Sequence, residues 1–265
     1  VGWEADQYRK AGFATLTYES ISTRVVRDAP TTGARPLWGS LVADGFAALA
    51  TLAAHTRIDP GRIAVTGYSL GAEVTRLLAF ESLRRASVAG ELRYAAHVAV
   101  YPCHVWAPDL VDGSLTGAPV LEQLGEKDDC GPVAKAQALV ATYKAKAIAA
   151  PVTVTLYKGA YHSWTDPNFA SARYFPNHAS PAKFPLQVVR PGLGFLDPDG
   201  TVRPFSGDEA TACSKASKGY TQGHDPQIRE KSFTDGVAFL RECAEHAPEK
   251  PEGIRRDPQV ASGFA

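Results

Sequence analysis

The stretch that decides the fold is RIAVTGYSLGAEVTRLLAF, residues 62–80, in which Ser69 stands between two glycines. A short apolar run precedes the serine, and a segment rich in helix-forming residues follows it. The five residues from Gly67 to Gly71 match the pattern G-x-S-x-G. We therefore predict a strand, a sharp turn and a helix, with the hydroxyl of Ser69 presented at the turn.

The chemistry expected of Ser69 follows from its place at this turn. A serine with a strained backbone crowds its neighbours, so a glycine is expected on each side of it. The hydroxyl would project from the carboxyl edge of a sheet, beside helix N–H groups that can stabilise an anion. The pattern alone is weak, and the alternative is a serine that only caps the helix. The strand before Ser69 and the helix after it favour a nucleophile.

The rest of the chain alternates apolar runs with helical patterns. Unbroken apolar strands in this alternation predict an α/β fold with a mostly parallel central sheet and helices on both faces. Glu122 and Gln123 are unexpected inside one of these runs. The predicted strands are 13–18, 62–67, 97–102, 119–125 and 151–159, and the predicted helices are 3–11, 38–55, 71–86, 131–148 and 228–243.

The length of 265 residues is typical of a single domain, which we take to span residues 1–265. Residues 165–228 are rich in Pro, Gly and Asn with little periodicity, and we expect a loop-rich excursion that could form a lid or a rim. A crossover helix normally follows a strand. The helix predicted at 3–11 therefore suggests a further sheet strand upstream of Val1.

Composition limits the classes of partner and cofactor. Lys plus Arg and Asp plus Glu both number 28, so no net field attracts nucleic acid or an anionic membrane. No apolar run approaches the roughly 20 residues that span a bilayer. The sequence carries no HExxH, no paired CxxC and no phosphate-binding glycine loop. We expect a small-molecule substrate and no metal or organic cofactor.

The four cysteines allow three disulfide pairings if all are bridged. They are Cys103, Cys130, Cys213 and Cys243. Cys103 and Cys130 each follow a predicted strand, so they could lie on the same edge of the sheet. An even count fits an exported protein, and four free buried thiols fit a cytoplasmic one nearly as well; we slightly favour export.

A serine nucleophile needs a base and an acid that orients the base. In this architecture both should follow Ser69 in the order acid, then histidine, each after a later strand. Asp128 and Asp129 follow the strand at 119–125, and His162 follows the strand at 151–159. His104 also stands at a strand end but precedes the acid, which makes it the weaker candidate for the base. We therefore predict a catalytic triad of Ser69, His162 and one of the two aspartates.

On these residues the chain resembles the dienelactone hydrolase family of the α/β-hydrolase superfamily. RIDPGRIAVTGYSLGAE (57–73) resembles the nucleophile turn, PVLEQLGEKDDCGP (119–132) the acid loop and YKGAYHSW (157–164) the histidine loop. The resemblance implies an α/β-hydrolase fold and a hydrolase that cleaves a carboxylic ester or lactone through an acyl-enzyme. In such loops the acid lies three residues after the glycine, which selects Asp128 over Asp129.

The chain departs from the best-known members of that family. They commonly carry a cysteine nucleophile, and Ser69 occupies that position here, which shifts the expectation toward general carboxylic esters. The N–H of Leu70 would be one donor of the oxyanion hole, and the second donor is expected upstream of Val1. The alternatives are a peptidase or acyltransferase on the same scaffold, and a catalytically inactive binding protein, although all three triad positions are filled.

Aromatic residues near the triad positions are candidates for the substrate pocket. For each of them, packing in the core is an equally good interpretation. Arg24 and Arg27 could bind an anionic group of the substrate or form surface ion pairs. The pocket candidates are Tyr68, His104, Trp106, Tyr161 and Trp164.

Overall fold

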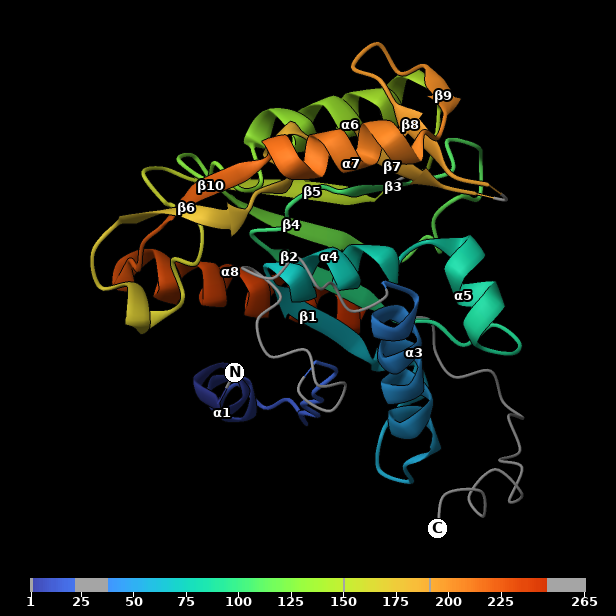
Figure 1. Ribbon diagram of the computed structural model, residues 1–265. Helices are drawn as coiled ribbons and strands as arrows, with labels where there is room; N and C mark the ends of the chain where they lie inside the picture. The colour runs from blue at the N-terminus through green and yellow to red at the C-terminus, as the bar shows by residue number, and fades with distance from the viewer. Residues whose placement is uncertain (1, 22–37, 150, 191, 247–265) are drawn as a thin grey trace.

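The computed structural model of the chain describes residues 2–21, 38–149, 151–190 and 192–246. At its centre lies a parallel sheet of four strands in the order β1-β2-β4-β5 (Figure 1). Parallel strands need crossover connections, and helices supply them here. The strands are β1 (Ala64–Tyr68), β2 (Ala96–Val100), β4 (Val120–Gly125) and β5 (Val152–Tyr157). They correspond to four of the five predicted strands.

Helices cover both faces of this sheet, as predicted. Residues of α3, α4 and α6 share one hydrophobic cluster, and residues of α1 and α8 belong to a second cluster. Figure 1 shows α4 in front of the sheet and α8 behind it. The helices are α1 (Gly2–Lys10), α3 (Trp38–Ala54), α4 (Leu70–Leu77), α5 (Glu81–Ser87), α6 (Val133–Ala145) and α8 (Pro226–Glu245). No helix among the described residues is both long and apolar enough to span a bilayer.

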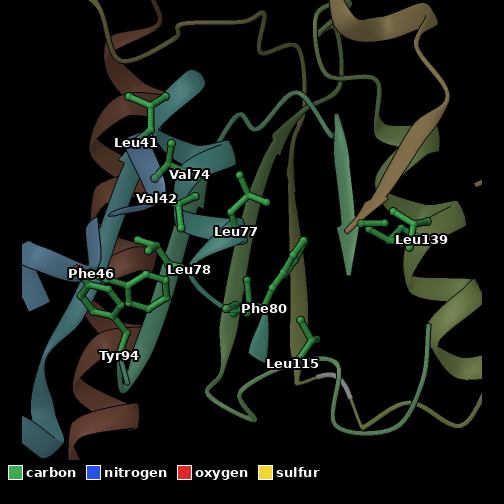
Figure 2. Close-up of a cluster of buried hydrophobic side chains, with 14 of the residues drawn as sticks. Leu41, Val42, Phe46, Val74, Leu77, Leu78, Phe80, Tyr94, Leu115 and Leu139 are labelled. Carbon is green, nitrogen blue, oxygen red and sulfur yellow. The ribbon is translucent and has the colours of Figure 1, made fainter. Parts of the chain in front are cut away.

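The packing of α3 on α4 fixes the helix that follows Ser69. Phe46 of α3 and Leu77 of α4 lie in the buried cluster that Figure 2 shows. A Cβ at Gly45 would lie 2.8 Å from a methyl carbon of Leu78, so a larger residue there would require the Leu78 side chain to shift. The hydroxyl of Tyr94 donates a hydrogen bond of 2.6 Å to the carbonyl of Gly45. Thus α3 packs closely against the end of α4, and Tyr94 attaches α3 to the segment before β2.

The polar residues inside β4 have partners on both faces of the sheet. Side chains alternate between faces along a strand. Accordingly Glu122 bonds to Arg76 of α4 at 2.8 Å, while the amide of Gln123 donates to the carbonyl of Ser232 in α8 at 2.7 Å. The two residues are therefore not interruptions of the strand. They join β4 to the helices on either side of it.

The described part of the stretch 165–228, which is expected to be rich in loops, contains several short strands and one helix. It contains two small sheets outside the central one, β10-β6 and β3-β7-β8-β9, the second of which includes a strand from before the stretch. Strands of three to seven residues, broken by Pro and Gly, give little periodicity to recognise in the sequence. The elements are β3 (Trp106–Pro108), β6 (Arg173–Ala179), β7 (Leu186–Val189), β8 (Gly194–Leu196), β9 (Val202–Pro204), α7 (Gly207–Ala216) and β10 (Lys218–Gln222).

Two expectations about regular elements are wrong. Residues 13–18 form no strand: Leu16 and Tyr18 are more than 40% exposed, and the segment pairs with no described strand. An alternating apolar run becomes a strand only where a neighbouring strand accepts its backbone hydrogen bonds. The helix predicted at 71–86 is divided into α4 and α5, because Phe80 has extended backbone angles and pairs with Leu115.

Candidate active site

Ser69 stands at the turn between β1 and α4 with an unusual backbone conformation. Its φ is 52°, in the left-handed region that a residue with a side chain rarely adopts. Its N–H donates to the carbonyl of Val100 at 3.0 Å, which ties the turn to the neighbouring strand β2. A Cβ at Gly67 would lie only 2.1 Å from the carbonyl oxygen of Gly71, so only glycine fits before the serine. Strain of this kind concentrates at functional sites.

Three side chains from separate loops meet at the carboxyl edge of the sheet. The Oγ of Ser69 is 2.8 Å from Nε2 of His162, which follows β5. The Nδ1 of the same imidazole is 2.9 Å from Oδ2 of Asp128, which follows β4. Asp128 and His162 are buried, and Ser69 is half-buried. A hydroxyl, an imidazole and a carboxylate thus lie in one hydrogen-bonded series.

The two aspartates of the acid loop have different partners. The second oxygen of Asp128, Oδ1, accepts hydrogen bonds of 2.9 Å from the N–H groups of Cys130 and Gly131. These bonds fix the carboxylate while Oδ2 faces the imidazole. Asp129 instead accepts from the N–H of Thr221 in β10 at 2.7 Å. The structure therefore places Asp128 at the imidazole and Asp129 at the neighbouring strand.

Two opposing effects set the pKa of His162. Burial lowers the pKa because the charged imidazolium loses water, but the charge and hydrogen bond of Asp128 outweigh burial. The net result is a pKa raised from 6.5 to about 9. The carboxylate thus stabilises the imidazolium, the state that the ring would reach on taking a proton from Ser69.

A buried ionic cluster supports the loop that follows β2. The carboxylate of Glu73 accepts hydrogen bonds of 2.9 to 3.0 Å from the N–H groups of His104, Val105 and Trp106. Arg76 donates to both Glu73 and Glu122, at 2.9 and 2.8 Å. Glu73 and Arg76 lie on α4, directly after Ser69. The cluster therefore couples the helix that carries the serine to the loop beside it.

Sequence reasoning missed the support that β10 gives to the histidine loop. The carbonyl of His162 accepts from the N–H of Gly223 at 3.0 Å, and Ser163 donates to the side chain of Gln222 at 2.9 Å. The ring of Tyr220 lies 5.3 Å from the imidazole, edge to face, on the strand that Asp129 also holds. These residues lie about sixty positions after the histidine, and no local pattern marks them. The sequence signal for them is the lid or rim expected at residues 165–228, which contain Tyr220 and Gln222.

Of the pocket candidates, His104 and Trp164 lie inside the protein. His104 is fully buried, with Nε2 at 2.8 Å from Glu122. Trp164 is fully buried too, with its ring 4.6 Å from that of Tyr101 and its N–H donating to Ser232. Their surroundings match the packing alternative, since neither side chain reaches solvent.

The other candidates are partly exposed. Tyr68 packs with the cluster of α1 and α8 and lines a cavity of about 10 Å³, room for about one water. Trp106 meets Trp38 edge to face, with ring centroids 5.9 Å apart. The ammonium of Lys127 lies 5.2 Å over the ring of Tyr161. Arg24 and Arg27 lie outside the described residues.

Leu70 begins α4, so its N–H is among the first four of the helix, which have no acceptor within the helix.

The group that could hold a metal among the described residues consists of Cys103, Cys130 and His162, whose ligand atoms lie within 4.8 Å of one another. Both ring nitrogens of His162 already have partners in Ser69 and Asp128. A metal there would compete with one of these two hydrogen bonds.

Comparison of the chain with known proteins gives one family and several similar solved structures. A model of the dienelactone hydrolase family matches residues 8–183, and no curated protein matches the chain. An α/β-hydrolase enzyme from a Medee basin deep-sea metagenome library is 25% identical over 46% of this chain and 50% of its own, with a TM-score of 0.36. A dienelactone hydrolase-like promiscuous phosphotriesterase from metagenomic libraries is 17% identical over 83% of this chain and 66% of its own, with a TM-score of 0.45.

A third solved structure is esterase 2 of Thermogutta terrifontis, phosphoramylated by tabun. It is 13% identical over 80% of this chain and 67% of its own, with a TM-score of 0.48. The chain thus spans half to two thirds of the length of these structures. Because the family's sequence pattern extends over more than half of the chain, the protein belongs to the dienelactone hydrolase family and has an α/β-hydrolase fold.

Proposed function

We propose that the chain hydrolyses a carboxylic ester or lactone through a catalytic triad of Ser69, His162 and Asp128. One observation carries the proposal: an unbroken series of hydrogen bonds, of 2.8 and 2.9 Å, joins the hydroxyl, the imidazole and the carboxylate. The hydroxyl stands on a strained turn at the start of a helix. Each of these features is what a serine nucleophile requires.

In the proposed reaction, Nε2 of His162 takes the proton of Ser69 as Oγ attacks the carbonyl carbon of the substrate. The tetrahedral intermediate then collapses, the imidazolium gives its proton to the leaving alkoxide, and an acyl-enzyme remains. Water repeats the sequence and releases the acid. Asp128 holds Nδ1–H, which leaves Nε2 free to accept the proton. In a lactone the acyl and alkoxy groups belong to one ring, so the alkoxide remains attached to the acyl group when the ring opens.

The proposed oxyanion hole includes the N–H of Leu70, at the first position of α4. A helix N-terminus carries unpaired N–H groups and a partial positive charge, both of which favour a developing oxyanion. Loss of one such donor typically costs about 3 kcal/mol of transition-state stabilisation. The proposed role of Leu70 belongs to its backbone, so it does not depend on the leucine side chain.

We also propose that residues 165–228 form one rim of the site. Tyr220 and Gln222 belong to this stretch and lie against the histidine loop, through the ring contact with His162 and the bond to Ser163. A substrate that reaches Ser69 would therefore pass close to β10. Tyr161 and Trp106, which are partly exposed, remain the proposed contacts for the substrate, and Tyr68 has a weaker claim because its ring packs toward α1 and α8.

The test is hydrolysis of p-nitrophenyl acetate and butyrate by the wild type and by Ser69→Ala. We expect the variant to lose about 10⁴-fold or more in kcat, since members of a triad act as a unit. Ser114→Ala is the matched control: Ser114 is buried, and its Oγ has no hydrogen-bond partner among the described residues. A fluorophosphonate probe should label Ser69 in the wild type and in the control.

Equal rates in the wild type and in Ser69→Ala would contradict the proposal, as would labelling of another residue. If the folded wild type bound ester analogues yet hydrolysed none between pH 6 and 10, the inactive binding protein would replace the enzyme as the best interpretation.

A further inference from the structure

Two thiols lie beside the imidazole of His162. Cys103 belongs to the turn after β2 and Cys130 to the loop after β4, and their sulfur atoms are 3.2 Å apart. A nitrogen of His162 lies within 4.8 Å of the sulfurs. Both cysteines are free. We propose that Cys103 and Cys130 are an oxidation site, at which an intramolecular disulfide cross-links the two loops that flank the histidine.

The backbone on both sides of the pair is already held in place for this bond. A Cβ at Gly131 would lie 2.1 Å from the carbonyl oxygen of Pro102, so the two loops touch directly beside the cysteines. The N–H groups of Cys130 and Gly131 bond to Asp128. A disulfide needs a sulfur–sulfur distance of about 2.05 Å, so the sulfurs must approach by about 1 Å. The proposal requires that rotation of the two side chains supplies this movement.

The turn that carries Cys103 is also constrained. Tyr101 and His104 both have positive φ, 45° and 50°, and the N–H of His104 bonds to Glu73 at 3.0 Å. Three backbone N–H groups of this segment donate hydrogen bonds to the Glu73 carboxylate, and these bonds oppose displacement of the segment. These bonds hold the backbone of Cys103 beside the acid loop, where its sulfur lies 3.2 Å from that of Cys130.

The proposed bond would brace the groups around the imidazole. The acid loop carries Asp128, and the turn after β2 carries Tyr101, whose ring lies 5.0 Å from that of His162. A covalent link between Cys103 and Cys130 would join the acid loop to the turn after β2. Because the cysteines are 27 positions apart, the link also restricts the unfolded chain, which stabilises the folded state.

The chemistry needs an oxidant, and a small-molecule disulfide such as oxidised glutathione supplies it. Cys103 is partly exposed and reacts first: its thiolate attacks one sulfur of the oxidant, forms a mixed disulfide and releases one small thiolate. The thiolate of Cys130 then attacks the sulfur of Cys103 and releases the second. Two protein thiols are oxidised, one small disulfide is reduced to two thiols, and the two protons pass to the departing thiolates.

The order of the two steps follows from the surroundings of Cys130. The hydrogen bond to Cys103 and burial both raise the pKa of the Cys130 thiol. Burial also keeps Cys130 from the oxidant, so the partly exposed Cys103 reacts first. Once Cys103 carries the mixed disulfide, the adjacent Cys130 can displace the small thiol.

The test compares the full chain equilibrated with oxidised glutathione and with dithiothreitol, both with EDTA. Free thiols are alkylated, and peptides are analysed by mass spectrometry without reduction. We expect a cross-linked peptide that contains Cys103 and Cys130, lighter by two hydrogen atoms than the separate peptides. The oxidised chain should melt about 5–10 °C higher than the reduced one.

Variants separate this pair from the other thiols. Cys130→Ser and, as a second variant, Cys103→Ala should melt at the same temperature in both buffers. The double variant Cys213→Ser/Cys243→Ser keeps the pair and should show the full shift. The proposal is overturned if both thiols remain alkylated in the oxidised chain, if the cross-link joins other cysteines, or if the double variant loses the shift.

These measurements do not use hydrolysis, so their failure is distinct from failure of the proposed function. If the reduced pair retained Zn²⁺ in the absence of EDTA and gave no cross-linked peptide on oxidation, a metal site would replace the oxidation site.

Discussion

Arg76 of α4 donates a hydrogen bond of 2.8 Å to Glu122 of β4, and both side chains are buried. The same guanidinium donates to Glu73, so one cation neutralises two buried carboxylates. Burial alone would raise the pKa of Glu122, but Arg76 and His104 lower it to about 2. Conversely, the two carboxylates outweigh burial and raise the pKa of Arg76. The helix after Ser69 and the strand before Asp128 are thus joined through one ion pair.

Replacing the guanidinium should therefore be costly. We expect Arg76→Met to lower the free energy of unfolding by about 3–5 kcal/mol, because two carboxylates would remain buried without a cation. Arg85→Met is the control, since the Arg85 side chain is 75% exposed and pairs with Glu81 at the surface, where a salt bridge contributes about 1 kcal/mol or less. Urea unfolding measures both. Similar losses in the two variants would contradict the importance given to the buried cluster.

The raised pKa of His162 predicts a pH dependence of opposite sign for activity and stability. The proposed base must be neutral, so kcat/KM should rise with pH with a midpoint near pH 9. The raised pKa also means that the folded state binds a proton that the unfolded state releases. This stabilisation is fully present below about pH 6.5 and is lost as the pH rises through about 9. Rate profiles and thermal unfolding from pH 6 to 10 measure the two effects.

Asp128→Asn should change that profile in a specific way. Without the carboxylate, burial dominates and the midpoint of the rate profile moves below pH 6.5, while kcat falls by about 10⁴-fold because the imidazole loses its orientation. Asp129→Asn is the matched control in the adjacent position, and it should shift the midpoint much less, since Asp129 bonds to Thr221. A midpoint near 6.5 in the wild type, or equal shifts in the two variants, would argue against the assigned roles.

The sequence allowed the contact between Ser69, Asp128 and His162 to be predicted because each residue directly follows a strand of one parallel sheet. In such a sheet the carboxyl ends of the strands lie at one edge, so position along the chain translates into proximity. The partners of Glu122 and Gln123 could not be predicted in the same way. Arg76 lies 46 positions before Glu122, and Ser232 lies 109 positions after Gln123, which leaves no local pattern to recognise.

The errors have physical causes as well. The run at 13–18 has strand-like residues, but a strand also needs a paired neighbour, which residue types do not reveal. The sheets within 165–228 use strands too short to show a period, so the sequence indicates only a loop-rich stretch there. Tyr220 and Gln222 were missed for the same reason. Their importance arises from the place where β10 meets the histidine loop.

The two glycines that flank Ser69 should respond differently to substitution. Sequence reasoning expected both to be required, but a Cβ at Gly71 would meet nothing within 4 Å, whereas a Cβ at Gly67 would overlap the carbonyl of Gly71 and Oγ1 of Thr75. Gly67→Ala should therefore destabilise the fold and abolish activity. Gly71→Ala should fold and gain about 0.5–1 kcal/mol, because glycine is unfavourable within a helix. Thermal unfolding checks this, and a lower melting temperature for Gly71→Ala would show that the space is needed.

The last prediction concerns the support of the histidine by β10. Tyr220 packs its ring against His162 and is buried, whereas Tyr174 on the adjacent strand β6 is 55% exposed and is not among the described rings that contact the imidazole. We expect Tyr220→Ala to lower kcat about tenfold, because loss of the ring lets the imidazole depart from its alignment with Ser69. Tyr174→Ala should change kcat little. Steady-state kinetics with p-nitrophenyl butyrate, together with melting temperatures, separate misalignment from unfolding. Equal kcat values in two folded variants would mean that β10 only encloses the site, and that Asp128 and the strand β5 suffice to hold the imidazole.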